Sequence, residues 1–253
     1  MFILLCFVTA RQFNGQNKKE NKMYKRILLK ISGEALAGKD GNGLNEEMVE
    51  KVVSQLVALR EKGTEIAIVV GGGNFWRGRQ GKNMDRSTAD YMGMLATTLN
   101  ALALCDAIES KGVPARVQTA ININVVAEPF ILRKAQKHLE RKRIVIFACG
   151  TGNPYFTTDT GAALRAAQIK ADALIMAKNI DGVYDSDPRT NPEAKKFDKL
   201  TYMEVMNRGL SVMDLTSITM CMENHIPIIA FGLGEKDSII RAGMGEKIGT
   251  LIN

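Results

Sequence analysis

Between Arg143 and Ala162 the chain reads Arg143-Ile-Val-Ile-Phe-Ala-Cys-Gly150, Thr151-Gly-Asn-Pro-Tyr-Phe-Thr-Thr-Asp159 and Thr160-Gly-Ala162. The run from Ile144 to Cys149 is short, apolar and β-branched, which is typical of a strand buried on both faces. The nine residues after Gly150 are turn formers and hydroxyls, and strong helix formers follow, with Thr158 or Asp159 as the expected N-cap. The pattern predicts a strand, a polar loop and a helix, an arrangement that directs backbone N–H groups at an anion.

A purely structural helix cap is the alternative interpretation of this loop. A cap needs one or two special residues, whereas this loop contains three Thr, an Asn, a Pro and an Asp. We therefore favour a binding loop.

The same alternation of apolar runs and helical patterns continues in both directions. Strands are expected at 25–31, 65–70, 113–119, 144–149, 173–177 and 226–231, with a short one within 245–252. Helices are expected at 45–62, 87–111, 128–140, 162–170, 201–207 and 214–224. This order predicts an α/β fold, an open and mostly parallel sheet between two layers of helices, with ligands beyond the carboxyl ends of the strands. The 87–111 helix is apolar nearly all round, so we expect it to be buried or at a subunit contact.

Composition limits the protein classes. The chain has 253 residues, 45% of them apolar and 24% charged, which is enough for a full core. The net charge is +7, but residues 1–30 hold seven Lys or Arg and one Glu, which leaves +1 for the rest. A nucleic-acid-binding face should instead spread its charge over the folded part. We interpret residues 1–22 as an N-terminal extension, disordered or not native, with Met23 as the natural start.

Cysteine and histidine offer little chemistry here. The four Cys, at 6, 105, 149 and 221, form no Cys-x-x-Cys pair, so we expect reduced thiols in a cytoplasmic protein and no metal ligands. His138 and His225 lie far apart in sequence, and we predict structural roles for both. No apolar run approaches the length of a membrane span, so no membrane partner is expected.

The unusual loops all follow strands. Neither the P-loop nor the dinucleotide fingerprint is present. Glycines at strand ends nevertheless let backbone N–H groups approach phosphate oxygens. Such loops are Gly71-Gly-Gly73 beside Arg77, Ser32-Gly33 after Lys30, and the Thr-rich loop before Asp159.

Phosphoryl transfer needs mainly positioning and charge stabilisation, which suits these loops. Lys30 is placed to bridge donor and acceptor phosphates, although a solvated lysine is its ordinary role. Asp159 is placed to orient Lys30 or to help position Mg²⁺, and its alternative is an N-cap that contributes about 1 kcal/mol.

Six motifs, taken together, resemble the bacterial uridylate kinases of the amino acid kinase family. The resemblance runs from about residue 23 to the end, with the motifs in family order. They are Lys30-Ile-Ser-Gly33-Glu34-Ala, Gly71-Gly-Gly-Asn-Phe-Trp-Arg77-Gly, Asp90-Tyr-Met-Gly-Met-Leu-Ala-Thr, Thr151-Gly-Asn-Pro-Tyr-Phe-Thr-Thr158-Asp159, Asp181-Gly-Val-Tyr184-Asp-Ser-Asp187-Pro and Met244-Gly-Glu-Lys-Ile-Gly-Thr.

The resemblance implies transfer of the ATP γ-phosphoryl group to UMP in pyrimidine biosynthesis, with Mg²⁺ carried by ATP. It implies one kinase domain, 23–253, with an acceptor-binding part at about 23–165 and an ATP-binding part at about 166–253. The implied catalytic residues are Lys30 and Asp159. The implied ATP-binding residues are Lys30, Ile31, Ser32, Gly33, Gly73, Arg77, Asn179, Tyr184 and Asp187. The implied UMP-binding residues are Gly72, Asp90, Thr151, Gly152, Asn153, Pro154, Tyr155, Phe156, Thr157 and Thr158, with Asp90 placed for the ribose hydroxyls.

Three further features follow from the same resemblance. It implies a homohexamer, with GTP as activator and UTP as inhibitor, and it matches Asp106, Arg116 and Arg143 to the GTP site. Relatives differ in length after the fifth strand, so either Lys178 or Asn179 takes the nucleotide-contacting position. Some relatives carry a Lys where this chain has Met176, and a catalytic role for Lys178 stays open.

Two rival functions remain at this point. Another amino acid kinase with a carboxylate or carbamate acceptor would share Lys30 and the glycine loops but not the Thr151–Asp159 loop. A nucleic-acid-binding protein would use the basic tail but would not need Asp90. We therefore expect no nucleic-acid partner.

Overall fold

The computed structural model describes residues 23–38, 41–77 and 83–253. The predictions about residues 1–22 and about Cys6 lie outside these residues. Within them, nine strands form one sheet in the order β4-β3-β5-β2-β1-β6-β10-β11-β9. The strands are β1 (Arg26–Ile31), β2 (Glu65–Val70), β3 (Ala115–Thr119), β4 (Glu128–Pro129), β5 (Ile144–Ala148), β6 (Ala173–Lys178), β9 (Lys199–Leu200), β10 (Ile228–Gly232) and β11 (Thr250–Ile252).

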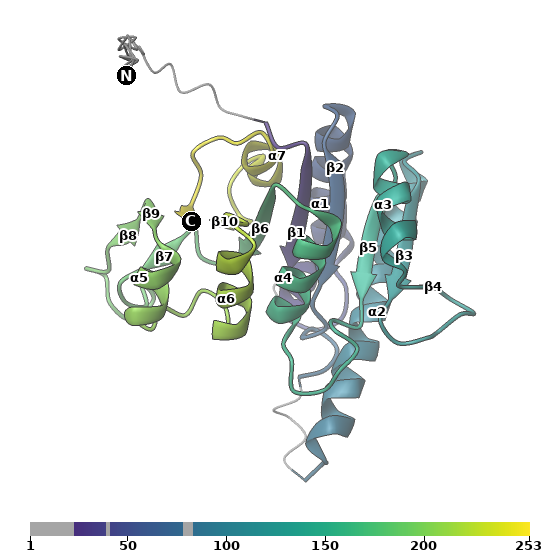
Figure 1. Cartoon of the computed structure of the whole chain (residues 1–253), viewed down its shortest axis with the longest axis horizontal. Coiled ribbons are helices and arrows are strands. Elements are labelled where there is room, and N and C mark those ends of the chain that lie inside the picture. The colour runs from purple at the N-terminus through teal and green to yellow at the C-terminus, as the bar shows by residue number, and fades with distance from the viewer. Residues whose placement is uncertain (1–22, 39–40, 78–82) are drawn as a thin grey trace, which may run out of the picture.

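The sheet is parallel at every described pairing except that of β10 with β11. A separate hairpin pairs β7 (Val183–Tyr184) with β8 (Lys196–Phe197). The predicted α/β fold with a mostly parallel sheet is confirmed. Figure 1 shows β4 and β9 at opposite sides of the molecule, with β1 and β2 near the middle.

Helices cover both faces of the sheet. The helices are α1 (Glu46–Glu61), α2 (Arg86–Ser110), α3 (Leu132–Glu140), α4 (Thr158–Ile169), α5 (Tyr202–Asn207), α6 (Leu215–Glu223) and α7 (Ser238–Gly243), with a 3-10 turn, η1 (Gly33–Leu36), after β1. One layer consists of α1, α2 and α7, and the other of α3, α4 and α6, with α5 against α6. The three-layer prediction is therefore also confirmed.

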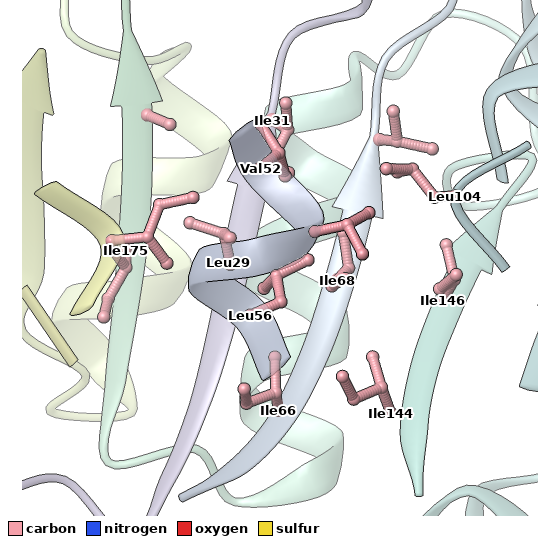
Figure 2. Close-up of a cluster of buried hydrophobic side chains, with 14 of the residues drawn as sticks. Leu29, Ile31, Val52, Leu56, Ile66, Ile68, Leu104, Ile144, Ile146 and Ile175 are labelled. Carbon is pink, nitrogen blue, oxygen red and sulfur yellow. The ribbon is translucent and has the colours of Figure 1, made fainter. Parts of the chain in front are cut away.

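The core follows the two-residue period of the strands. Alternate side chains of β1, β2 and β5 point to the same side, where α1 covers them (Figure 2), and the residues between them pack under α4 on the other face. Strands buried on both faces explain why their sequences are continuous apolar runs. The residues labelled in Figure 2 are Leu29, Ile31, Val52, Leu56, Ile66, Ile68, Leu104, Ile144, Ile146 and Ile175.

Two predicted boundaries are wrong. The helix expected from residue 128 begins at Leu132, because Glu128 and Pro129 pair with β3 and the N–H of Phe130 donates to the carbonyl of Thr119. The N-cap of α4 is Thr157, not Thr158 or Asp159. Its hydroxyl accepts from the N–H groups of Asp159 and Thr160, at 3.1 and 3.2 Å.

Helix α2 is long and apolar enough, by length and composition alone, to cross a membrane. One face of it packs on β3, β5 and α1, as expected of a core helix. The other face exposes Tyr91, Leu95 and Leu99, at 43%, 48% and 50% of their surface. These three residues are spaced by one helical turn each, so they form one apolar stripe, which we call the α2 stripe.

Candidate functional site

The triglycine loop after β2 is fixed by a pair of asparagines. Asn74 and Asn100 donate to each other through their amides, at 3.0 and 2.7 Å, and Asn100 also donates to the carbonyl of Gly71 at 2.7 Å. A Cβ on Gly33 would lie 2.2 Å from Asn74 Oδ1. The loops after β1 and β2 therefore interlock, and a side chain at Gly33 would push them apart.

Gly72 lies directly under α2. A Cβ there would meet Ala96 Cβ at 2.8 Å and the backbone of Gly93 and Thr97 at 2.9 Å each. The sequence suggested that this glycine lets a phosphate approach the backbone. The structure adds a packing reason, because only glycine lets α2 lie this close to the loop.

Lys30 and Asp159 meet at the carboxyl edge of the sheet. Lys30 Nζ lies 2.9 Å from Asp159 Oδ1, with 16% and 21% of the two side chains exposed. The oxygen is buried and accepts no well-aligned hydrogen bond from the described residues, so the contact is an ion pair. Asp159 also lies in the first turn of α4, where a negative charge is stabilised by the helix dipole.

The polar loop after β5 begins with a strained turn. Cys149 and Gly150 both have positive φ, 63° and 54°, and the N–H of Cys149 donates to Thr97 Oγ1 at 2.7 Å. A non-glycine residue in this region costs energy, and such residues concentrate at binding sites. The strained turn therefore marks the start of the loop as a candidate binding segment.

Asp90 joins this loop to α2. Its carboxylate accepts from the N–H of Tyr155 at 2.8 Å and pairs with Arg86 Nε at 2.8 Å. Arg86 in turn lies over the Tyr155 ring, 5.4 Å from its centre. In Figure 1 the loop and the N-terminal end of α2 lie at the same end of the sheet.

Asp214, the N-cap of α6, holds the other end of the loop. Its carboxylate accepts from the hydroxyls of Thr157 and Thr160, the latter at 3.1 Å, and from the N–H of Ser217 at 2.9 Å. Burial works to raise its pKa, but the hydrogen bonds from Ser217 and Thr157 outweigh burial and lower the pKa below the usual range. The sequence predicted a helix beginning near Asp214 and missed its contact with the loop. A capping Asp was the only available signal.

Two cavities open at this edge. The first, of about 620 Å³, is lined by residues from β1, the end of β6, the β7 region and the turn at 208–212. The second, of about 280 Å³, lies between the triglycine loop, α2 and the polar loop. Lys30 lines the first cavity, and Thr158, next to Asp159 in the chain, lines the second.

The predicted ATP residues divide between the cavities. Lys30, Ser32, Asn179, Tyr184 and Asp187 line the first cavity, whereas Gly73 and Arg77 line the second, and Ile31 and Gly33 line neither. Arg77 nevertheless reaches across, because it pairs at 2.6 Å with Glu34, which lines the first cavity.

Two polar groups of the first cavity already have partners within the chain. The hydroxyl of Tyr184 donates to Asp181 at 2.7 Å. Hydrogen bonds from Arg189 lower the pKa of Asp187 to about 2. Asp187 therefore stays ionised across the physiological pH range.

The predicted UMP residues divide as well. Those that line the second cavity are Gly72, Asp90, Thr151, Phe156, Thr157 and Thr158, and those that do not are Gly152, Asn153, Pro154 and Tyr155. Tyr155 is 67% exposed, and its N–H donates to Asp90, which lines the cavity.

The predicted GTP residues lie away from both cavities. Arg116, near the start of β3, pairs with Glu109 at 2.9 Å, and Asp106 is exposed on α2. Burial, followed by Glu109, raises the pKa of Cys105 to about 11, and both Arg116 and Asp106 act on the same thiol. Arg143 instead donates to Nδ1 of His138 at 3.2 Å. Arg116 and Arg143 lie near the amino ends of β3 and β5, and Asp106 lies near the C-terminal end of α2.

Arg165 was missed by sequence reasoning because nothing in a helical pattern marks it. It is 5% exposed, lies 3.6 Å from the centre of the Phe130 ring, and donates to the carbonyl of Gly150 at 3.4 Å. Burial lowers its pKa to about 10. This buried guanidinium therefore helps to hold the strained turn at Cys149 and Gly150 through its hydrogen bond to the Gly150 carbonyl.

No group of three or more His, Cys, Asp or Glu residues that could hold a metal ion occurs among the residues that the structure describes. Cys149 and Cys221 are buried free thiols as predicted, and Cys105 is a partly buried one. The contact of His138 with Glu128, at 3.1 Å, agrees with a structural role.

One family profile and several solved structures match this chain. The profile of the Amino acid kinase family matches residues 25–231. The UMP kinase of Bacillus anthracis is 39% identical, with 92% of this chain and 97% of that chain covered and a TM-score of 0.89. The UMP kinase of Ureaplasma parvum is 36% identical, with 90% and 98% covered and a TM-score of 0.86. The uridylate kinase of Archaeoglobus fulgidus is 28% identical, with 90% and 99% covered and a TM-score of 0.68.

Proposed function

The chain belongs to the amino acid kinase family, and from this premise we propose that it transfers the γ-phosphoryl group of ATP to UMP, giving ADP and UDP, as a step of pyrimidine nucleotide biosynthesis. The observation that carries the proposal is the pair of cavities on either side of the Lys30–Asp159 ion pair. Similarity to UMP kinases at 39% and 36% identity over about nine tenths of the chain supports UMP as the acceptor.

ATP occupies the first cavity in this proposal, and UMP the second. The bond between the γ-phosphorus and its bridging oxygen breaks, and a bond from that phosphorus to a UMP phosphate oxygen forms. We assign to Lys30 the stabilisation of the charge that moves between the two oxygens, because it lines the first cavity and pairs with Asp159, whose neighbour in the chain, Thr158, lines the second. Stabilising such charge in a partly desolvated site is the main task in phosphoryl transfer.

No general base is required, because the attacking phosphate oxygen carries no proton in ionised UMP. This agrees with the position of Asp159, whose carboxylate faces Lys30. We assign to Asp159 the orientation of Lys30, which makes it a positioning residue.

In this proposal, the polar loop at 151–158 and Asp90 recognise UMP. A carboxylate suits a ribose diol, and Asp90 has lone pairs beyond those used by Arg86 and Tyr155. Backbone N–H groups of the 151–158 loop and the N-terminus of α4 suit the base edge and the phosphate.

Mg²⁺ enters with ATP as part of the substrate. The described residues hold no cluster of three potential ligands, so the phosphates would supply most of the coordination.

The division into an acceptor part, 23–165, and an ATP part, 166–253, is supported by the lining of the two cavities, with Lys30, Ser32 and Glu34 as exceptions that reach into the ATP cavity.

Regulation and assembly belong to the same proposal. We propose GTP activation at Asp106, Arg116 and Arg143, UTP inhibition, and a homohexamer in the cytoplasm. The α2 stripe supports self-association, because an apolar stripe of this kind is costly to leave in water. Three free thiols in the described part fit a reducing compartment.

A coupled ADP-release assay tests the acceptor. Purified protein with Mg-ATP is given UMP, CMP, dUMP, AMP, glutamate or carbamate. We expect a strong preference for UMP, up to about 10⁴-fold, as a hydrogen-bonding base pocket can provide. Turnover of carbamate or an amino acid without UMP turnover would contradict the proposal and favour the rival acceptor class.

A further inference from the structure

Some backbone N–H groups of the polar loop have no hydrogen-bond acceptor within the described part of the chain. Those of Thr151, Phe156 and Thr157 donate to no described residue. All three residues line the second cavity. Backbone N–H groups placed in this way are donors for the oxygens of a bound anion. Their directions therefore affect how tightly the cavity binds its ligand.

The peptide group between Gly150 and Thr151 is held from one side by α4. Nη2 of Arg165 donates to the carbonyl oxygen of Gly150 at 3.4 Å. Gly161 packs against the same peptide group, because a Cβ on Gly161 would lie 3.1 Å from the carbonyl carbon of Gly150 and 3.5 Å from the nitrogen of Thr151. The peptide is trans, so its N–H points opposite to its carbonyl. The N–H of Thr151 is therefore directed away from Arg165.

The guanidinium of Arg165 is unfavourably placed for a group with a packing role alone. It lies 3.6 Å from the centre of the Phe130 ring, and Nη1 donates to Gln168 Oε1 at 2.7 Å. Burial lowers the pKa of Arg165 to about 10, and no charged neighbour contributes to this shift. An apolar side chain would fill the same space without the desolvation of a cation. The charge at this position therefore calls for a functional explanation.

We propose that Arg165 is a positioning residue of the acceptor site, which holds the Gly150–Thr151 peptide so that the N–H of Thr151 donates to an oxygen of the acceptor nucleotide. This inference rests on the proposed function, in which the second cavity binds UMP. A cation at the carbonyl end polarises the peptide group, which makes the N–H at the other end a stronger donor. Arg165 does not line the cavity, so it acts on the nucleotide through this one peptide group.

A comparison of KM with kcat tests this role. Arg165→Met removes the donor and keeps an apolar stem beside the Phe130 ring. We expect the KM for UMP to rise about 10-fold, the lower end of the effect of a charged hydrogen bond, while kcat and the KM for ATP stay within about threefold of wild type. Equal rises of both KM values, or an unchanged KM for UMP in the folded variant, would overturn the inference.

A conservative variant and a surface control separate the charge from the packing. Arg165→Lys keeps a cation near the Gly150 carbonyl, so its KM for UMP should lie between those of wild type and Arg165→Met. A value as high as that of Arg165→Met, or higher, would overturn the inference. Arg133→Met is the control, because Arg133 is exposed on α3, and it should leave all three kinetic constants unchanged.

Folding of each variant is checked by circular dichroism and thermal melting. If neither Arg165 variant folds, Phe130→Leu carries the test, because it removes the ring beside the guanidinium and leaves the charge in place. We expect Phe130→Leu to raise the KM for UMP at least about threefold with kcat unchanged. An unchanged KM for UMP in this folded variant would overturn the inference.

The inference and the proposed function fail in different ways. Turnover of UMP by wild type, with an unchanged KM for UMP in folded Arg165→Met, would remove the role of Arg165 and leave UMP kinase activity intact. Turnover of another acceptor in place of UMP would contradict the proposed function. A selective rise of the KM for that other acceptor in Arg165→Met would still support the positioning role of Arg165.

Discussion

At the scale of single residues, the account depends on where positive charge lies. Lys30 has one described ion-pair partner, Asp159, and lines the larger cavity. The sequence predicted this pair because Lys30 stands at the end of one predicted strand and Asp159 at the end of the loop after another. It left the role of Lys178 open, because a Lys at a strand end has no local signal that tells a catalytic cation from a solvated one.

We predict that Lys30→Ala lowers kcat about 10²- to 10³-fold with little change in the KM for UMP. Its contact matters most in the transition state, so the loss appears in turnover. Steady-state kinetics measure it, with Lys25→Ala as the control, because Lys25 is exposed at the opposite end of the same chain segment. A raised KM with unchanged kcat would show that Lys30 only binds substrate.

Asp90→Asn should raise the KM for UMP about 10-fold or more with kcat within about threefold of wild type. The amide oxygen can still accept from the N–H of Tyr155, so the loop stays anchored while the charge facing the ribose is lost. Kinetics with UMP and dUMP measure the effect. A collapse of kcat at unchanged KM would mean that Asp90 does not hold the acceptor.

At the scale of elements, a helix N-cap could be predicted where the sequence offered a single candidate residue. Asn45 was predicted to cap α1, and its side chain accepts from the N–H of Met48 at 3.0 Å. The cap of α4 was misplaced, since Thr157, Thr158 and Asp159 are all good caps. Asp214, distant in sequence, settles the choice by accepting from the hydroxyl of Thr157. Local sequence carries no information about that partner.

Asp214→Asn should destabilise the protein by about 1 kcal/mol at pH 7, the usual scale for a cap. The folded-state pKa of Asp214 is lowered relative to the unfolded chain, so its stabilisation is present at neutral pH and is lost as the pH falls through the folded pKa. Urea unfolding at pH 7 and in acid should therefore show a smaller difference in acid.

The matched control is Asp237→Asn, because Asp237 occupies the N-cap of α7 without a side-chain cap hydrogen bond. That variant should be nearly neutral at both pH values. A difference between Asp214→Asn and wild type that grows in acid would contradict the assigned role.

At the scale of the molecule, the mostly parallel sheet and its two helical layers followed from the alternation of apolar runs, whereas the strand order did not. The antiparallel placement of β11, the β7–β8 hairpin and α7 did not, because these elements are only two to six residues long and carry weak periodic signals. The site could be predicted as a set of loops at one edge. The two cavities are lined by segments far apart in the sequence, and the close approach of α2 to Gly72 has no local sequence signal.

We predict that the double variant Leu95→Glu and Leu99→Glu runs as a smaller species than wild type in sedimentation velocity. Two carboxylates in the α2 stripe would have to be desolvated on association, which is costly. Met203→Glu, on the exposed surface of α5, is the control and should leave the size unchanged. An unchanged sedimentation coefficient in the double variant would remove α2 from the subunit contact.

The central claim is that donor and acceptor cavities adjoin across Lys30 and Asp159. The most direct measurement is calorimetry with adenosine and uridine joined 5′ to 5′ by a pentaphosphate. The account predicts one molecule per chain, displacement of both ATP and UMP, and affinity at least about 10²-fold above that of ATP, because the second half binds intramolecularly. Displacement of ATP alone, with affinity no better than that of ATP, would contradict the claim.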